Sequence, residues 1–159
     1  MTTVFRLLTV GSLAASLSAC TMMSGHDLPG ASGLIELRSP YSVTDTLDRV
    51  SAAGAALGFK TAARINHAQA AQDAGLTLRP TEVLLLGNPA GGTPLMQCAQ
   101  TVAIDLPMKF LAYQNAAGQV VLAYNDPVYL QRRHRASGCG EAFGKASTAL
   151  ARIAADALK

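Results

Sequence analysis

Residues 83–86 form an unbroken run of four aliphatic side chains, with Glu82 before it and Gly87 after it. A half-exposed strand alternates apolar and polar residues, whereas a short continuous apolar run is typical of a strand that is covered on both faces. Half of the 159 residues are hydrophobic but only 5% are aromatic and 14% charged, so aliphatic side chains must fill the core. We therefore expect a folded domain around this strand, which excludes a disordered chain, a fibrous repeat or a disulfide-rich miniprotein.

The first 19 residues have the pattern of a secretory signal peptide. Arg6 and the free amine precede an apolar run over residues 7–17. This run is shorter than the ~20 residues that a membrane-spanning helix needs. It ends in Leu17-Ser18-Ala19-Cys20, which resembles the lipobox that precedes the lipidated cysteine of bacterial lipoproteins.

The lipobox resemblance implies cleavage before Cys20 and attachment of acyl chains to that residue, which together anchor a domain firmly to a membrane. Thr21 follows the cysteine. Because an Asp at that position would resemble an inner-membrane retention signal, we expect the outer membrane, with the domain facing the periplasm. The alternative is an ordinary signal peptide with a chance cysteine.

The chain divides into a signal peptide over residues 1–19, a lipidated cysteine with a flexible tether over 20–32, and one domain over 33–159. The tether is small, polar and contains glycine and proline. Without residues 1–19, 12 basic residues face 10 acidic ones, a net charge of +2. So small a charge argues against a nucleic-acid partner.

Two cysteines, Cys98 and Cys139, remain after Cys20 is assigned to lipid. An even pair in an oxidising compartment favours a disulfide, although two buried free thiols remain an alternative. The sequence contains no CxxC, CxxCH or paired Cys/His spacing. We therefore expect no zinc or haem site, and no cofactor.

The periodicity of the domain predicts an α+β fold. Ser42 and Asp45 form a capping box at the start of a helix that ends at Gly58, with apolar residues at helical spacing between them. The other expected elements are strands over 34–38, 59–66, 82–87, 107–114 and 119–125, and helices over 67–74, from Thr93, and over 140–158.

This order, β-α-β-α-β-α-β-β-α, suits a two-layer sandwich with helices on one face of a mixed sheet. The apolar run at residues 83–86 suggests that the other sheet face is covered too. A second subunit would cover it in a homodimer.

Three regions could carry chemistry. The glycine-rich segment 87–94 connects a strand to a helix and could offer backbone N–H groups to an anion, but a tight turn is the plainer interpretation. His67, at the end of a strand, could act as a base or ligand or merely cap a helix. Glu82 and Asp105 would form a polar pocket with His67 if the strands bring them together, or each is a turn or cap residue.

The basic segment Arg132-Arg133-His134-Arg135 has two interpretations. It could hold an anionic head group or membrane phosphates. With a net charge near +2, a solvated surface loop is the simpler prediction.

Several motifs taken together resemble the domain of unknown function 302 family. They are Phe59, Arg64-Ile65-Asn66-His67, Leu76, Leu78, Pro80, Val83-Leu84-Leu85-Leu86-Gly87-Asn88-Pro89, Gly92-Thr93-Pro94-Leu95-Met96 and Asp105-Leu106-Pro107. The match covers about residues 34–130.

The resemblance implies a small α+β domain that pairs as a homodimer, with no established reaction, cofactor or substrate. The family usually has Asp at the position of Asn66. The asparagine in this sequence removes a negatively charged partner for His67. By position, the candidates for a shared pocket are His67, Asn88, Thr93, Met96 and Asp105, together with Glu82.

The leading interpretation is a lipid-anchored periplasmic binding or interaction domain without catalysis of its own. One alternative is an enzyme or redox-accessory protein that uses His67 with Glu82 or Asp105 in a cleft. The other is a structural envelope protein that acts through a dimer face.

Overall fold

The computed structural model describes Met1 and residues 32–159. The predicted signal peptide, Cys20 and nearly all of the tether lie outside the described residues. The elements are β1 (Leu34–Ser39), α1 (Val43–Ala56), β2 (Lys60–Asn66), α2 (His67–Asp73), β3 (Thr81–Gly87), α3 (Pro89–Cys98), the 3₁₀ helix η1 (Gln100–Asp105), β4 (Met108–Gln114), β5 (Val120–Asn125), α4 (Pro127–Arg133) and α5 (Gly140–Ala157).

The strands form one five-stranded sheet in the order β1-β5-β4-β3-β2, and every neighbouring pair is antiparallel. The α+β class is confirmed, but the expectation of a mixed sheet is wrong. A parallel neighbour requires a crossover that returns the chain to the same end of the sheet. The connection through the seven-residue α2 instead turns the chain back, so that β3 runs antiparallel beside β2.

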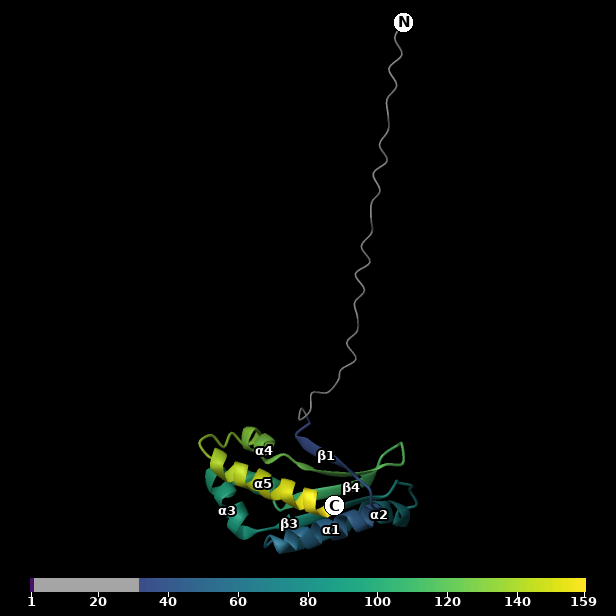
Figure 1. The fold of residues 1–159 in the computed structure, drawn as a ribbon, viewed down its shortest axis with the longest axis horizontal. Coiled ribbons are helices and arrows are strands. Elements are labelled where there is room, and N and C mark those ends of the chain that lie inside the picture. Colours follow the sequence, from purple (N-terminus) through teal and green to yellow (C-terminus); the bar gives the residue numbers. More distant parts are fainter. Residues whose placement is uncertain (2–31) are drawn as a thin grey trace.

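The helices α1 and α5 lie side by side across one face of the sheet (Figure 1). Their apolar faces meet the inward side chains of the central strands. The fully buried side chains of this core include Leu47 and Val50 of α1, Leu84 and Leu86 of β3, Phe110 of β4, Leu122 of β5, and Phe143, Leu150 and Ile153 of α5. Among the described residues, these side chains belong to one hydrophobic cluster that extends from Val43 to Ala157, as expected of a domain with its own core.

Helix α1 begins as predicted. The Ser42 hydroxyl accepts a hydrogen bond from the Asp45 backbone N–H at 3.1 Å and donates one to the Asp45 carboxylate at 2.7 Å. Near the other end of the helix, a Cβ on Gly54 would stand 2.8 Å from Cδ1 of Leu86. The helix therefore approaches the sheet more closely than any side chain at this position allows.

The opposite face of the sheet carries the other half of the apolar run in β3. Val83 and Leu85 are partly exposed there, whereas Glu82, Leu84 and Leu86 between and beside them are buried against the helices. In the strand register, Val83 pairs with Ile65 on one side and with Leu111 on the other. A row of partly exposed apolar side chains thus crosses this face.

Two helices depart from the sequence predictions. Helix α3 begins at Pro89 rather than after Thr93, because Asn88 caps it: the Asn88 side-chain oxygen accepts from the N–H groups of Ala90 and Gly91 at 3.1 and 3.3 Å. The supposed glycine-rich turn is therefore the first half of a helix. Because the Asn88 side chain occupies those two N–H groups, they are not open to an anion.

Helix α4 was not expected, so the prediction of a loop at the basic segment is wrong for Arg132 and Arg133, whereas the predicted solvent exposure is found for Arg132, Arg133 and Arg135. Asp126 caps α4 through a 2.9 Å bond from the Val128 N–H, and Pro127 occupies its first turn. Arg132 and Arg133 form its last turn. An acidic cap followed by proline is a recognised start signal for a helix, so the sequence carried this information locally.

Candidate functional site

A broad groove runs between α3 and α5 and has a volume of about 1460 Å³. Its floor is apolar and includes Leu86, Leu95 and Met108, which are buried in the core below. Its walls carry short side chains from both helices: Ala90, Gly91, Gly92 and Thr93 of α3, and Ala142, Gly144, Ala146 and Ala149 of α5. The groove exists because these small residues leave the space between the two helices unfilled.

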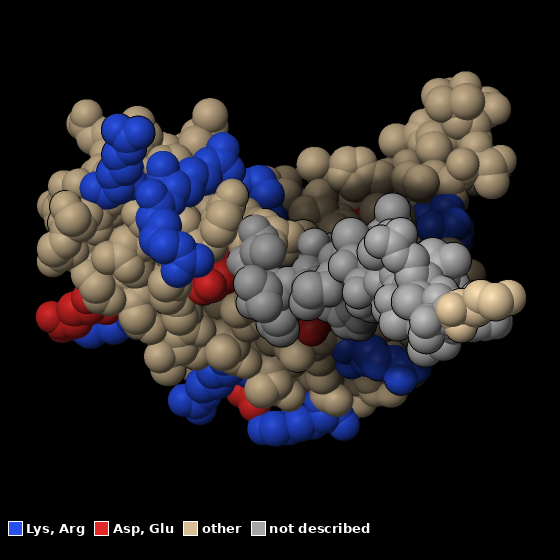
Figure 2. All heavy atoms as spheres, turned by 90° about the horizontal axis from the view of Figure 1, so that it is seen from above, with Lys and Arg blue, Asp and Glu red and all other residues tan. Residues whose placement is uncertain are grey.

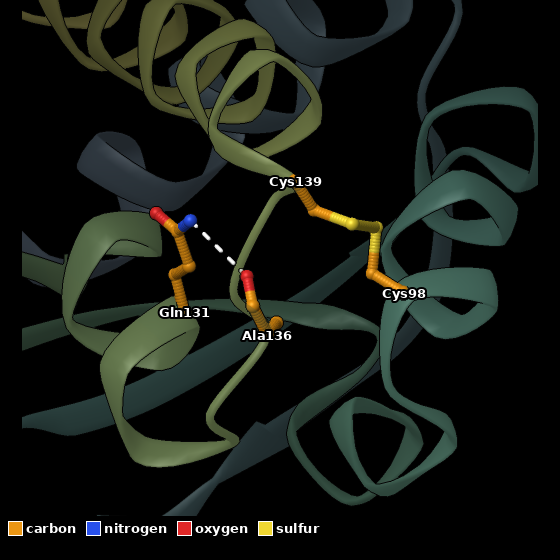
Figure 3. Close-up of a disulfide and its surroundings, with 4 residues drawn as sticks. All are labelled: Cys98, Gln131, Ala136 and Cys139. Atoms are coloured by element: carbon orange, nitrogen blue, oxygen red, sulfur yellow. Dashed lines mark hydrogen bonds between the residues drawn. A yellow bond between two sulfur atoms is a disulfide. The ribbon is translucent and has the colours of Figure 1, made fainter.

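The Cys98–Cys139 disulfide is part of the lining of this groove and, as Figure 3 shows, links two separate segments of the chain. The S–S distance is 2.01 Å and the Cα atoms are 6.2 Å apart. Cys98 is the last residue of α3, and Cys139 immediately precedes α5. The bridge therefore fixes the spacing of the two helix ends, and the expected pairing is confirmed.

The segment before Cys139 is held in place by a side chain of α4. The Gln131 amide Nε2 donates to the backbone carbonyl of Ala136 at 3.2 Å, close to the disulfide in Figure 3. Ala136 is itself buried. The loop that leads into α5 is thus bound to α4 on one side and to α3 through the disulfide on the other.

Three of the predicted site residues, Asn88, Thr93 and Met96, line this groove. Thr93 is exposed and Met96 is half-buried. Charged side chains stand on the α5 wall: Lys145 pairs with Glu141 at 2.7 Å, and Arg152 lies two turns further along. The lining thus combines an apolar floor with a few polar groups, as small-molecule sites do.

The remaining predicted residues are not brought into this groove. Asp105 is buried and pairs with His134, not with His67: His134 Nε2 lies 2.6 Å from the Asp105 carboxylate. The other ring nitrogen of His134 lies 3.0 Å from the Thr101 hydroxyl. Because His134 is 29 residues away from Asp105 in the sequence, no local pattern pointed to this pair.

The order hydroxyl, imidazole and carboxylate in this cluster is also the order found in hydrolase triads. A catalytic triad, however, needs a concave site at its nucleophile. Thr101, Asp105 and His134 do not line the groove between α3 and α5, nor the smaller cavity beside Glu82. In the structure, this cluster joins η1 to the end of α4, and we refer to it as the clasp.

Glu82 takes part in a different polar cluster. Its buried carboxylate accepts from the Thr44 hydroxyl at 2.7 Å and from Arg64 at 2.8–2.9 Å, and Arg64 also pairs with Asp48 of α1. Partial burial lowers the pKa of Arg64, but hydrogen bonds to Asp48 and Glu82 outweigh this and hold the pKa above its ordinary value. This cluster ties β2 and β3 to α1, at the edge of a smaller cavity of about 580 Å³.

His67 is the exposed first residue of α2 and lines neither cavity. Asn66 caps this helix, because its side-chain oxygen accepts from the Gln69 N–H at 2.8 Å. The residue that caps α2 is thus Asn66, and not His67 as the capping interpretation had it. In the described part of the chain, Glu82 pairs with Arg64 and Asp105 pairs with His134, so His67 is not the partner of either carboxylate.

Within residues 32–159, no three His, Cys, Asp or Glu side chains are grouped so as to hold a metal ion. In the same part of the chain, no helix has the length and hydropathy needed to cross a bilayer.

Comparison with known families gives a match over residues 35–155 to "Domain of unknown function DUF302". The chain belongs to the DUF302 family. Its fold is shared by an uncharacterised conserved DUF302 protein from Bacillus stearothermophilus, whose crystal structure superposes with a TM-score of 0.73. That match covers 81% of this chain and all of the other at 19% sequence identity, so it supports the DUF302 fold alone.

The DUF302 chain is also similar to part of two curated Brucella proteins. Both carry the name "Fluoride-specific ion channel FluC 1", one from Brucella suis biovar 1 (strain 1330) and one from Brucella abortus biovar 1 (strain 9-941). The identity is 43% over 103 residues, which is 65% of this chain. The match spans 41% of the first relative and 38% of the second, so most of each relative has no counterpart in this chain.

Proposed function

We propose that this DUF302 protein is a lipid-anchored periplasmic binding domain, without catalysis of its own, whose groove between α3 and α5 takes an apolar small molecule. The observation that carries the proposal is the groove itself, with its apolar floor, small-residue walls and volume of about 1460 Å³. Ligand sites in proteins are concave, mostly apolar and provided with few polar groups.

The anchoring part of the proposal rests on the sequence. Residues 17–20 resemble a lipobox, and Cys20 is the residue that would carry the acyl chains. The Cys98–Cys139 disulfide supports an oxidising compartment such as the periplasm. Mass spectrometry of the protein from bacterial membranes tests this anchor. The expected result is a mature N-terminus at Cys20 with added acyl mass, and an unmodified chain would contradict it.

Binding in the groove is tested with N-phenyl-1-naphthylamine, an apolar dye that fluoresces when it leaves water. The chain contains no tryptophan, so protein emission does not obscure the dye. Gly144 lies on the groove wall, and a Cβ there would meet nothing within 4 Å. Gly144→Leu is therefore expected to narrow the groove and weaken the dye signal, whereas Gly144→Ala, which adds only a methyl group, should keep most of it.

Equal dye binding by wild type and Gly144→Leu would contradict the groove as the site. Unfolding of the Gly144→Leu variant would also reduce the dye signal. Far-ultraviolet circular dichroism of both variants is therefore the control. Native mass spectrometry of the purified protein then identifies any ligand that is retained from the cell.

A homodimer through the open face of the sheet is part of the same proposal. Val83, Leu85 and Leu111 are partly exposed there, and Ile65 is 43% exposed. Burying this row against a second copy would remove apolar surface from water on both partners. Sedimentation is expected to give a dimer, and Leu111→Arg is expected to give a monomer. A wild-type monomer at high concentration would contradict this assembly. It would also argue against a structural role of the protein through this face.

A second candidate function follows from the similarity to the Brucella relatives, whose name describes a fluoride-specific ion channel. We propose, as that candidate, that the domain serves a membrane transport protein as an envelope-side partner. One form of this candidate is that the domain itself binds fluoride, and fluorine NMR of fluoride mixed with the purified domain tests it. Saturable line broadening would favour this candidate, and an unchanged line is expected if the groove serves only an apolar ligand.

A further inference from the structure

We propose that Arg132, Arg133 and Arg135 form a surface that contacts anionic phospholipid head groups, so that the domain lies against the membrane with α4 facing it. We refer to these three side chains as the arginine surface. Its orientation toward a membrane rests on the proposed anchor at Cys20, but its affinity for lipid does not.

The arginine surface stands on the element at which the chain enters the domain. Gly33 packs directly on the ring of Tyr129 in α4, where no larger residue fits, and has a φ of 73°. The Gly33 carbonyl also accepts a hydrogen bond from the Asp126 N–H at 2.8 Å. Gly33, next to the first residue of the domain that the structure describes, therefore lies against α4.

The distance to the anchor is short. Gly33 is thirteen residues after Cys20. An extended chain of that length spans at most about 45 Å, and a flexible one much less on average. A domain tethered in this way stays within about 45 Å of the bilayer, so that a basic surface beside the point of attachment can reach the lipid.

The three arginines are presented in a fixed arrangement. Arg132 and Arg133 occupy the last turn of α4, and the buried His134 that follows them is held by Asp105. Arg132 and Arg135 are exposed, and the Arg133 side chain is 50% exposed with one long contact, 3.4 Å, to Asp105. Figure 2 views the molecule from above, and Lys and Arg side chains gather there at the end of the visible surface where α4 lies.

Few acidic groups oppose this charge on the elements around it. Asp105 is buried beneath the surface and paired with His134. Asp126 stands at the opposite end of α4, where it caps the helix. Among the described residues, Arg133 shares the Asp105 carboxylate with His134, whereas no acidic partner is found for Arg132 or Arg135. These two guanidinium groups are left for an external anion, and guanidinium is well suited to phosphate oxygens.

Helix stability alone does not account for Arg135. Cations in the last turn favour the helix dipole, which explains Arg132 and Arg133. Arg135 lies beyond α4 with a φ of 52°, in the left-handed region that Gly or Asn adopts at lower cost. A large cationic side chain at such a position is better explained by what its charge binds than by the fold.

The test uses residues 21–159, which lack Cys20, so that no acyl chain contributes to binding. Sedimentation with vesicles of phosphatidylglycerol and phosphatidylethanolamine at low salt is compared with vesicles of phosphatidylcholine alone. We expect binding to the anionic vesicles only. Each arginine removed should weaken binding about 5-fold, and binding should fall as salt screens the charges.

The decisive variant is Arg135→Asn, which removes the charge and relieves the backbone. It is expected to unfold no more easily than the wild type, yet to bind anionic vesicles about 5-fold more weakly. The triple variant Arg132→Gln, Arg133→Gln, Arg135→Asn should lose binding. A matched control, Lys60→Gln, Arg79→Gln, Lys159→Gln, removes three exposed cations from other elements and should keep most of it.

Two results would overturn the proposal. One is the absence of wild-type binding to anionic vesicles at low salt. The other is equal weakening by the triple variant and its matched control, which would show that net charge alone drives the association. Either result leaves the anchor at Cys20 untouched, because the acyl mass on that residue is measured separately.

Discussion

His134 and Asp105 join the end of α4 to the end of η1 through a 2.6 Å contact between Nε2 and the carboxylate. Both side chains are nearly buried, at 7% and 12% exposure. The second ring nitrogen of His134 is used by Thr101, so the imidazole has a partner on each side. This clasp lies at the C-terminal end of α4, next to Arg133 and Arg135 in the chain.

Replacing Asp105 by Ala is expected to destabilise the domain by about 1–3 kcal/mol, because the buried imidazole then loses a hydrogen-bond partner. Urea unfolding followed by circular dichroism measures this change. Asp73→Ala is a suitable control, since Asp73 is exposed at the end of α2. Equal unfolding midpoints for the two variants would contradict the role of the clasp.

Replacing both Cys98 and Cys139 by Ser is expected to lower the free energy of unfolding by about 3–4 kcal/mol, because the bridge closes a long loop in the unfolded chain. The two residues are 41 positions apart. Chemical denaturation of the double variant measures the loss, and the wild type under reducing conditions should behave like the variant. If reduction leaves the wild-type midpoint unchanged, the bridge does not form.

Replacing Arg64 by Met is expected to cost about 2–3 kcal/mol, because Glu82 stays buried with the Thr44 hydroxyl but without its cationic partner. The double variant Arg64→Met, Glu82→Leu removes both charges and should recover part of this loss. Thermal and urea unfolding of the two variants provide the comparison. A double variant less stable than Arg64→Met would show that the ion pair is not what the cluster contributes.

Tyr113 is expected to make stability pH-dependent under alkaline conditions. A hydrogen bond to Glu36 at 2.7 Å, assisted by burial, raises the pKa of the Tyr113 phenol. The contribution is therefore complete below the ordinary pKa of about 10 and is lost as the pH rises from there through the raised pKa of the folded state. Burial also raises the pKa of Tyr124, which acts in the same direction.

The measurement is the urea midpoint between about pH 8 and pH 11 for the wild type and for Tyr113→Phe. The variant should lose stability less steeply above about pH 10, because it lacks one of the two shifted phenols. Parallel curves for the two proteins would contradict the assignment.

Two helical glycines should respond in opposite directions to the same substitution. Gly144 in α5 has nothing within 4 Å of its would-be Cβ, so Gly144→Ala should stabilise the domain by about 0.5–1 kcal/mol through helix propensity. Gly54 in α1 lies against Leu86, so Gly54→Ala should destabilise it by about 1–3 kcal/mol through overpacking. Thermal unfolding of both variants is the test, and shifts in the same direction would contradict this packing.

Local patterns predicted much of the fold. The capping box at Ser42, the hairpin of β4 and β5, the long helix α5 and the bridging of Cys98 with Cys139 all agree with the structure. Each depends on neighbours in the sequence, on helical periodicity or on compartment chemistry. The cap pairs at Asn88-Pro89 and Asp126-Pro127 were equally local, and a stricter use of the same rule would have found both helices.

The candidate site was predicted only in part. Asn88, Thr93 and Met96 do line one groove, but its other wall comes from α5, some fifty residues further along the chain. His67 lies apart from it, while Asp105 and Glu82 each have a partner that no spacing indicated: His134 and Arg64. Such pairs depend on how separate elements pack, which sequence spacing does not encode.

The sequence by itself determined the elements, the core faces of α1 and α5, and the chemistry available to each segment, because these follow from periodicity and from short-range hydrogen bonds. Only the tertiary structure decided that every strand pairs antiparallel, that α3 and α5 leave a groove between them, and that three arginines stand where the chain enters the fold. The physical reason is that these features are set by contacts between elements distant in sequence, whose geometry emerges when the core packs.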